Sequence, residues 1–496
     1  MNRYLSTLAY LCLAALGLAP GLLQAAVFPV TQCAGTRFGS DLGCTANDVM
    51  ITGMTVSSGP ATCTGGGSVT LDLSLTVNFG SPNRWDIGIF ISNDGKDPQL
   101  TVANGGATSC SVAVLPNTAP FLNLDSNGGT DTCGDGNSSI NGGTGSGVLN
   151  MTNVTVPCQS LSATGQLYIP FVVSWDNQAS PTGAICTSNA NPVPSTKSKC
   201  NAPTVAQGSV SVVVLPSITK SDGISVVTPG VPTTYAVTIT NSTGVTLSSG
   251  TGNAAVFKDP AVSNLSVSGV SCAASGGGSC PASSTVAGMQ GAGLTIPSLP
   301  NGGSVTFSVT ASVNGGTAAG TVITNTASVT ANGQSNTASD SNTVVYPSPV
   351  HLKTVSLVSD PVNGTTNPKF IPGAVADYTL RITNTGQGTI GNNTIVITDP
   401  IPPNTELFTG NLSGGAPFIF IDGIPASGLA CSFLALNNLT DCVDFSNDGG
   451  TSWSFVPNGG YDPAVSNVRF KPSGTMNANT GSGSPYFDLR FRVRVK

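Results

Sequence analysis

One long motif occurs twice in this sequence. PGVPTTYAVTITN at residues 229–241 returns as PGAVADYTLRITN at residues 372–384, displaced by 372 − 229 = 143 residues. The Pro, Gly, Tyr, Ile, Thr and Asn of the two copies fall in register. Two copies of a unit this long indicate one domain used twice rather than a solenoid of small repeats. We therefore expect domains at residues 214–346 and 347–496, with a separate domain at residues 27–213 before them.

Alternation of apolar and polar residues predicts an all-β fold. Residues 68–79 place every second residue, Val69 to Val77, on one apolar face. Short strands of this kind, separated by turn signals at roughly eight to twelve residues, are typical of a β-sandwich. Charged residues make up only 8% of the chain, against about 25% in an ordinary domain, so Thr, Ser, Asn and Gly must solvate the surface. We expect three tandem immunoglobulin-like β-sandwiches, of which the first is rich in disulfides.

The first 26 residues have the pattern of a cleaved signal peptide. Arg3 precedes an apolar run at residues 8–19, and the small residues Ala25 and Ala26 fit a cleavage site. The alternative, an uncleaved membrane anchor, is disfavoured because the run is short. Cys12 does not lie in a lipoprotein acylation motif. The expected destination is the cell surface or the medium of a Gram-negative bacterium, reached through the periplasm, without membrane insertion after cleavage.

Twelve of the 13 cysteines remain once the signal peptide is removed, an even number that suits an exported protein with paired disulfides. Eight belong to the first domain and two to each repeat. Proximity in the sequence predicts Cys272–Cys280 and Cys431–Cys442 in the repeats, and Cys110–Cys133 and Cys186–Cys200 in the first domain. The remaining candidates, whose pairing is left open, are Cys33, Cys44, Cys63 and Cys158.

A loop of the first domain has oxygen-bearing residues at alternate positions. Asp125, Asn127 and Asp131 are spaced in steps of two or four, and Asp135 follows. Such a loop can wrap a calcium ion, which takes six to eight oxygen ligands. The pattern departs from an EF-hand because Gly129 stands at a ligand position and no Glu closes the loop. The same residues also suit turns in a loop pinned by disulfides, so calcium is an expectation with an alternative. No other cofactor is expected.

Four short motifs together resemble a known family. They are K-(T/S), PGxxxxYxxxITN, (T/K)DP and TNTASV, and they cover residues 214–346, residues 347 to about 410 and the final strand. The combination resembles the bacterial "conserved repeat domain" of surface and secreted proteins, a domain of unknown function. The resemblance implies an immunoglobulin-like sandwich that serves as a spacer or adhesive module, and it implies no enzyme activity.

Sandwich domains of this surface class sometimes contain an intramolecular Lys–Asn isopeptide bond. The reaction needs a buried neutral lysine, an asparagine and a nearby carboxylate. By this resemblance Lys220, Asn325 and Asp259 are the candidates in the first repeat. The second repeat has Lys353 and an Asp-Pro pair but no asparagine-bearing strand. The alternative is that Asp259 opens a turn and Asn325 caps a strand.

The second repeat departs from the first after its Asp-Pro pair. From there to the Phe307 and Phe491 strands it is longer, 491 − 399 = 92 residues against 307 − 259 = 48. Nothing after Lys496 corresponds to TNTASV. Either the insertion supplies that strand or a sheet edge stays open. The basic residues of RFRVRVK at the end could protect such an edge, or the edge could receive a strand from another subunit.

Composition and motifs limit the classes of function. A single histidine and the lack of paired carboxylates in a recognisable frame argue against an enzyme. A net charge of −6 argues against nucleic acid as a partner. Trp85 and Trp175 each precede an Asp, and we interpret them as packing residues, with stacking on sugars as the alternative. The leading prediction is an exported structural or adhesive surface protein, with other surface proteins or glycans as partners. The alternative is a calcium- or glycan-binding protein that acts through its first domain.

Overall fold

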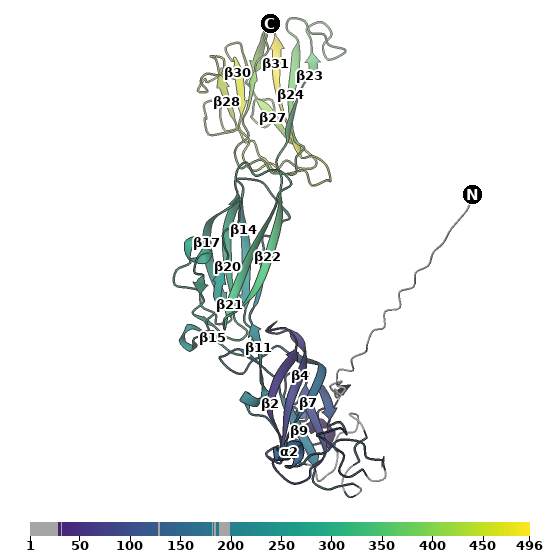
Figure 1. Ribbon diagram of the computed structural model, residues 1–496. Helices are drawn as coiled ribbons and strands as arrows, with labels where there is room; N and C mark the ends of the chain where they lie inside the picture. Colours follow the sequence, from purple (N-terminus) through teal and green to yellow (C-terminus); the bar gives the residue numbers. More distant parts are fainter. Residues whose placement is uncertain (1–27, 31, 127–128, 181, 183–184, 188–198) are drawn as a thin grey trace, which may run out of the picture.

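The computed structural model describes residues 28–30, 32–126, 129–180, 182, 185–187 and 199–496. The predicted signal peptide lies outside this part of the chain. Strands dominate, and the buried residues form separate cores that follow the sequence. Figure 1 shows the resulting bodies in a row, from the purple N-terminal part to the yellow C-terminal part. None of the helices in the described residues is long and apolar enough to span a membrane.

The N-terminal part, up to Leu215, is a β-sandwich. Its sheets have the strand orders β1-β6-β5-β9-β10, β2-β4-β7 and β3-β11-β8. The predicted alternation of β4 is confirmed, because its apolar face packs in one core with β5 and β9. The elements are β1 (Phe28–Val30), α1 (Ala34–Phe38), β2 (Val49–Ser58), β3 (Thr62–Thr64), β4 (Ser68–Phe79), β5 (Trp85–Ser92), η1 (Val102–Asn104), β6 (Cys110–Val114), α2 (Ile140–Gly143), β7 (Ser146–Pro157), β8 (Gln166–Tyr168), β9 (Phe171–Asp176), β10 (Lys199–Asn201), α3 (Val205–Gly208) and β11 (Ser209–Leu215).

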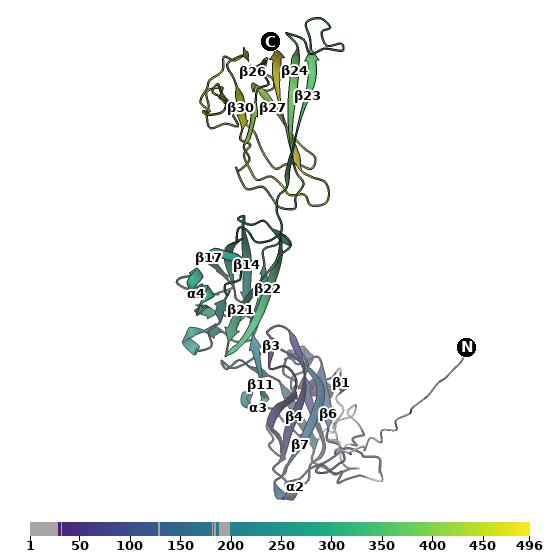
Figure 2. The same ribbon diagram turned by 45° about the horizontal axis from the view of Figure 1, so that its top comes forward.

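The middle sandwich, residues 216–346, packs two sheets face to face. One has the order β12-β14-β20-β17 and the other β13-β22-β21-β16-β18. Phe257 and Phe307 stack across the core with ring centroids 4.2 Å apart. The elements are β12 (Ser217–Ser221), β13 (Val226–Val227), β14 (Pro232–Thr240), β15 (Leu247–Ser248), η3 (Ser249–Thr251), β16 (Val256–Lys258), β17 (Leu265–Ser275), α4 (Val286–Gln290), β18 (Leu294–Thr295), β19 (Ser298–Leu299), β20 (Ser304–Val313), β21 (Val322–Ala331) and β22 (Gln334–Val344). Figure 2 shows α4 beside this sandwich, on the side away from β22.

The C-terminal sandwich, residues 347–496, has one large and one small sheet. The large sheet has the order β23-β24-β31-β26-β29, with β27 also paired to β31, and the small sheet has the order β25-β30-β28. The elements are β23 (Pro349–Ser359), β24 (Val375–Asn384), β25 (Ile397–Pro400), β26 (Thr405–Phe408), β27 (Phe418–Asp422), β28 (Val443–Ser446), β29 (Tyr461–Asp462), β30 (Asn467–Phe470) and β31 (Tyr486–Val495).

The repeated motif forms the same structure in both sandwiches. β14 pairs with β20 as β24 pairs with β31. Asn241 and Asn384 are fully buried, and each donates from Nδ2 to two backbone carbonyls. Gly230 and Gly373 have φ of 81° and 88°, a region that a side chain disfavours. In each repeat the glycine forms a left-handed turn before the strand, and the buried asparagine amide holds the loop after it. These two requirements explain why the motif is repeated.

Basic residues at the end of the chain do not protect an edge, contrary to that interpretation of the sequence. β31 is an interior strand, flanked by β24 on one side and by β26 and β27 on the other. Arg492 pairs instead with Asp377 at 2.7 Å, and Arg494 with Glu406 at 2.7 Å. One open edge of this sandwich lies along β25, which pairs only with β30 among the described strands.

All twelve cysteines of the described residues form disulfides. The two local pairs expected from the sequence, Cys272–Cys280 and Cys431–Cys442, are present. The pairs Cys110–Cys133 and Cys186–Cys200 are wrong, because strands far apart in sequence lie side by side in the sheets. β6 pairs with β1, which brings Cys110 to Cys33, and a bridge between Thr45 and Asn201 brings Cys44 to Cys200. The four disulfides of the N-terminal part are Cys33–Cys110, Cys44–Cys200, Cys63–Cys158 and Cys133–Cys186.

Candidate functional site

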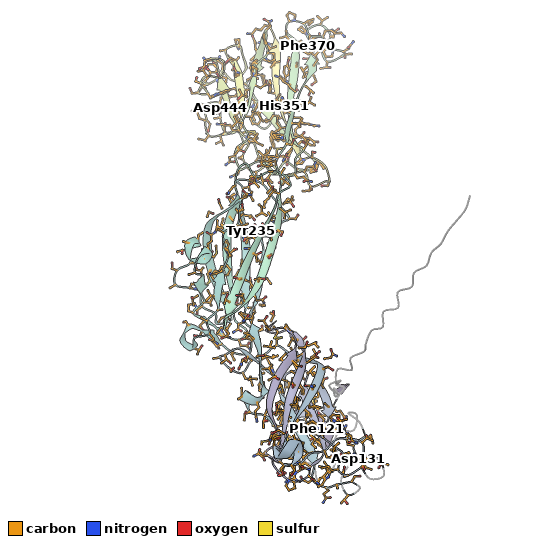
Figure 3. All side chains as sticks on the ribbon, in the orientation of Figure 1. Phe121, Asp131, Tyr235, His351, Phe370 and Asp444 are labelled. Atoms are coloured by element: carbon orange, nitrogen blue, oxygen red, sulfur yellow. A yellow bond between two sulfur atoms is a disulfide. The ribbon has the colours of Figure 1, made fainter. Side chains whose placement is uncertain are left out.

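A lysine points into the core of the middle sandwich. Lys220 lies at an inward position of β12, and its Nζ donates to Asp259 Oδ2 at 2.6 Å. The side chain of Lys220 is 0% exposed and that of Asp259 is 1% exposed. The same Nζ lies 4.9 Å from the ring centroid of Tyr235, which is labelled in Figure 3. Burial lowers the pKa of the Lys220 amine, although the Asp259 carboxylate opposes this effect. A lysine that loses its proton more easily is a better nucleophile.

Asn325 shares this region of the core. It lies in the interior of β21, opposite Asp340 of β22, and its side chain is buried. β12 lies against both strands, and the charge of Asp340 acts on Lys220. Neither Oδ1 nor Nδ2 of Asn325 has a hydrogen-bond partner among the described residues. Burying such an amide unpaired costs about 1–3 kcal/mol. The alternative that Asn325 caps a strand is wrong, since the residue is not at a strand end.

The C-terminal sandwich contains only part of this arrangement. Lys353 Nζ donates to Asp399 Oδ1 at 2.7 Å and lies 4.7 Å from the Tyr378 ring centroid. The side chain of Lys353 is 33% exposed, whereas that of Lys220 is 0% exposed. No described strand pairs with β25 where β21 pairs with β16. The lysine and the carboxylate are therefore present without an asparagine opposite them.

A second cluster, of acidic side chains, lies in the N-terminal part. Oxygens of Asp86, Asp125 and Asp135 all lie within 4.8 Å of one another. Asp86 is fully buried, and neither of its carboxylate oxygens receives a hydrogen bond from the described residues; the same holds for Asp125 Oδ1. Asp135 accepts from the backbone N–H of Asp86 at 3.0 Å and of Leu124 at 2.6 Å. Several oxygens thus converge on one point without enough donors to satisfy them.

The electrostatics of this acid cluster favour protons or a cation. Burial, together with the charges of Asp131, Asp125 and Asp135, raises the pKa of Asp86 to about 9. Burial also raises the pKa of Asp135 to about 7. Oxygen ligands of this kind suit a hard cation such as calcium. Figure 3 places Asp131 at the end of the N-terminal part that lies away from the middle sandwich.

The sequence identified part of this acid cluster. Asp125 and Asp135 do come together, and Asp131 lies close enough for its charge to act on Asp86. Asn127 lies outside the described residues. Asp86 was missed because it comes from β5, 39 residues before Asp125 (125 − 86 = 39).

A signal for Asp86 did exist in the sequence. The Trp-Asp pair occurs twice, and Trp85 lies opposite Asp176 where the ladder between β5 and β9 shifts register. Trp175 is fully buried, so the packing interpretation holds for it, and stacking of this ring on sugars is wrong. The repeated Trp-Asp pair marks the point where β5 turns an aspartate toward the acid cluster.

The fold and these clusters define a chain of disulfide-bonded β-sandwiches. No protein-family model and no curated protein matches it. Among solved structures, it is similar to the C-terminal domain of the AgI/II polypeptide BspA of Streptococcus agalactiae, at 11% identity and a TM-score of 0.23, over 56% of this chain and 92% of that one. The BcpA major pilin subunit of Bacillus cereus follows at 12% identity and 0.21, over 60% and 83%. A putative membrane-anchored protein of Corynebacterium diphtheriae gives 9% and 0.18, over 89% and 83%. At such scores the likeness carries no argument about function.

Proposed function

We propose that this chain is an exported, non-catalytic structural protein of the bacterial surface, whose middle sandwich is cross-linked by an isopeptide bond between Lys220 and Asn325. The observations that carry the proposal are the buried contact of Lys220 with Asp259, the packing of β12 against β21, and the buried side chain of Asn325, which has no hydrogen-bond partner among the described residues. The disulfides, the low charge and the resemblance of the repeats to the conserved repeat domain family support an extracellular role.

The reaction needs no cofactor. The neutral amine of Lys220 attacks Cγ of Asn325, a new C–N bond forms, and the bond from Cγ to Nδ2 breaks. Asp259 takes up the proton that the amine loses and returns it to Nδ2, which leaves as ammonia. The enclosed position of the three side chains excludes water, which would otherwise compete as a nucleophile and stabilise the charged amine.

Such a bond gives the sandwich a mechanical role. β12 is the first strand of the middle sandwich and β21 is one of its last, so the bond closes a loop of 325 − 220 = 105 residues. A force applied to the two ends of the sandwich then passes through a covalent bond between the two sheets. This property suits a spacer that holds other modules away from a cell.

The location is tested on cells of the source organism. Protease added to intact cells, followed by detection of the chain in surface, medium and periplasmic fractions, should recover it from the surface or the medium. Recovery only as a soluble periplasmic protein would contradict the surface role. That result would leave the cross-link open to its own test by mass.

The acid cluster favours a second candidate function, calcium binding by the N-terminal part. Three converging carboxylates, two of them with raised pKa values, would be neutralised by a divalent cation. Asp86, Asp125 and Asp135 would hold the ion, and Asp131 would add to the negative field. We expect calcium to raise the Tm of the wild-type chain and not of Asp86→Asn. Asp72→Asn, at a half-buried position of β4 outside the acid cluster, is the control, and an equal response of all three proteins would contradict the site.

A further inference from the structure

The two repeats differ at one strand edge. In the middle sandwich β16 lies between β21 and β18, so both of its edges are paired. In the C-terminal sandwich the corresponding strand, β25, pairs only with β30. One of the two neighbours of β16 therefore has no counterpart beside β25 among the described strands.

Backbone hydrogen bonds identify the missing neighbour. In a strand, successive peptide groups point to opposite sides. In the middle sandwich Ala255 O accepts from Ile296, on the β18 side. Ala255 lies four residues before Asp259, which binds the core lysine. In the C-terminal sandwich Ile401, two residues after Asp399, donates to Ser466 on the β30 side.

Ala255 is an even number of residues from Asp259, and Ile401 is an even number from Asp399. The backbone groups of the two aspartates therefore point to the β18 side and the β30 side, respectively. Because the two aspartates correspond, β30 lies on the side that β18 occupies in the middle sandwich. The side on which β21 and β22 lie in the middle sandwich has no described strand. The backbone groups of Val396 and Thr398 point to that side, because their counterparts Val256 and Lys258 pair there with β21. The insertion therefore does not supply the missing strand, and this edge of β25 is unpaired among the described residues.

A groove lies where these strands would be. It has a volume of about 670 Å³ and runs between β23 and β25. Its apolar lining is formed by Leu380, Ile382, Ile390, Ile395 and Ile397, with Lys353 and Asp399 beside them. We name it the β25 groove. In the middle sandwich the inward side chains of β21 fill the corresponding space, and Tyr235 donates to Asn342 of β22. Figure 3 shows His351, from the β23 wall of this groove, in the C-terminal sandwich.

We propose that the β25 groove receives an extended strand from a partner protein, which adds to β25 antiparallel as β21 adds to β16. The strand would present the alternating pattern that β21 shows, with Asn325, Ala327 and Val329 facing inward. Its backbone would pair with Val396 and Thr398. Open edges that carry apolar walls bind strands in this way. The asparagine would lie against the Lys353–Asp399 pair, which is neutral overall and suits an uncharged polar group.

The partner chemistry is argued from the chain itself. The middle sandwich contains a strand in this place, against the same lysine, aspartate and tyrosine. A charged strand would bury an unpaired charge beside a matched pair, which is unfavourable. A helix could not satisfy the backbone groups of the β25 edge. An alternating, uncharged strand with an inward asparagine meets all of these conditions.

The probe is a synthetic peptide with the sequence of β21, VITNTASVTA, carrying a fluorophore. Fluorescence anisotropy against the full mature chain should show saturable binding. Amide exchange should slow at Val396 and Thr398. Ile395→Lys, in the groove wall, should weaken binding at least about tenfold, because it buries a charge in the groove. Ile421→Lys replaces an equally apolar but distant exposed residue and should leave binding unchanged.

Modified peptides test the mode of binding without altering the protein. In β21 the N–H groups of Ser328 and Thr330 face β16, whereas that of Val329 faces β22. N-methylation at Ser328 or Thr330 should therefore abolish binding, and N-methylation at Val329 should not. Absence of binding, or equal loss at all three positions, would overturn the proposal. A dimer of the chain that Ile395→Lys dissolves would show that a second copy fills the groove, and this would overturn the separate partner.

Discussion

At the scale of single residues, the middle sandwich buries an amine, a carboxylate and an unpaired amide together. Lys220, Asp259 and Asn325 are all at most 7% exposed. Without a covalent bond, Asn325 would destabilise the fold, because its polar atoms have no hydrogen-bond partners among the described residues. With the bond, the same residue would be among the most stabilising in the chain. The two cases therefore predict different effects of replacing Asn325 on the stability of the middle sandwich.

We expect Asn325→Ala to destabilise the middle sandwich by about 4–5 kcal/mol, the value for a cross-link that closes a loop of this length. Without a bond the substitution would be neutral or stabilising. Thermal unfolding followed by calorimetry measures the difference. Lys353→Arg in the C-terminal sandwich is the matched control and should change little. A rise in the Tm of Asn325→Ala would contradict the cross-link.

The acid cluster predicts a pH dependence. The pKa of Asp86 is raised from 3.8 to about 9 in the folded chain. A group of this kind stabilises the fold below its unfolded pKa, and the stability is lost as the pH rises toward about 9. Without calcium, we expect the Tm of the N-terminal part to fall between about pH 4 and pH 9. Asp86→Asn should flatten this fall, and calcium should reverse it in the wild type. A Tm independent of pH would contradict the burial of these charges.

Residues of the sites differ in how far the sequence could predict them. Lys220, Asp259 and Asn325 each belong to a short motif, so a family resemblance was enough to select them. Asp86 has only the repeated Trp-Asp pair as a signal, and that pair does not show the register shift between β5 and β9 that turns Asp86 toward Asp135. A local departure from regular pairing depends on the whole sheet, and a sequence pattern does not contain it.

At the scale of elements, the disulfides fasten strands that are distant in the sequence. Cys44–Cys200 closes a loop of 156 residues, whereas Cys272–Cys280 closes one of 8. The alternation of β4 could be predicted because it depends on neighbours in the sequence, and the pairing of Cys44 could not, because it depends on the order of strands in a sheet. The same reason explains why β31 proved to be an interior strand.

The lengths of these loops predict unequal stabilities. On the chain-entropy estimate, replacing Cys44 and Cys200 with alanine should cost about 5 kcal/mol, and replacing Cys272 and Cys280 about 2.5 kcal/mol. Denaturant titration of the two double variants measures the loss in free energy of unfolding. It is measured for the N-terminal part in the first variant and for the middle sandwich in the second. A larger cost for the short loop would contradict the assignment of stability to loop length.

At the scale of the whole molecule, the sandwiches meet through short polar joints. Asn336 Nδ2 donates to Thr64 Oγ1 at 3.1 Å between the first two, and Thr389 N to Thr228 Oγ1 at 3.2 Å between the last two. Gly388 lies at the second joint, where an added Cβ would come within 2.5 Å of the Tyr346 backbone. The joint therefore depends on the absence of a side chain there.

We expect Gly388→Ala to loosen this joint without unfolding either sandwich. Small-angle X-ray scattering should show a broader range of overall dimensions than for the wild type, while the Tm of each sandwich stays the same. Gly315→Ala, at a position with nothing within 4 Å of an added Cβ, is the control. Identical scattering from all three proteins would contradict a close joint at Gly388.

The intact mass of the mature protein, purified without reduction, tests for the bond between Lys220 and Asn325. The cross-linked protein should have the mass of the sequence after signal-peptide removal, less twelve hydrogens for the six disulfides and less one ammonia. A proteolytic fragment that joins the peptides of Lys220 and Asn325 would place the bond. A mass that lacks the loss of ammonia, in protein that has folded and formed its disulfides, would contradict the cross-linked sandwich.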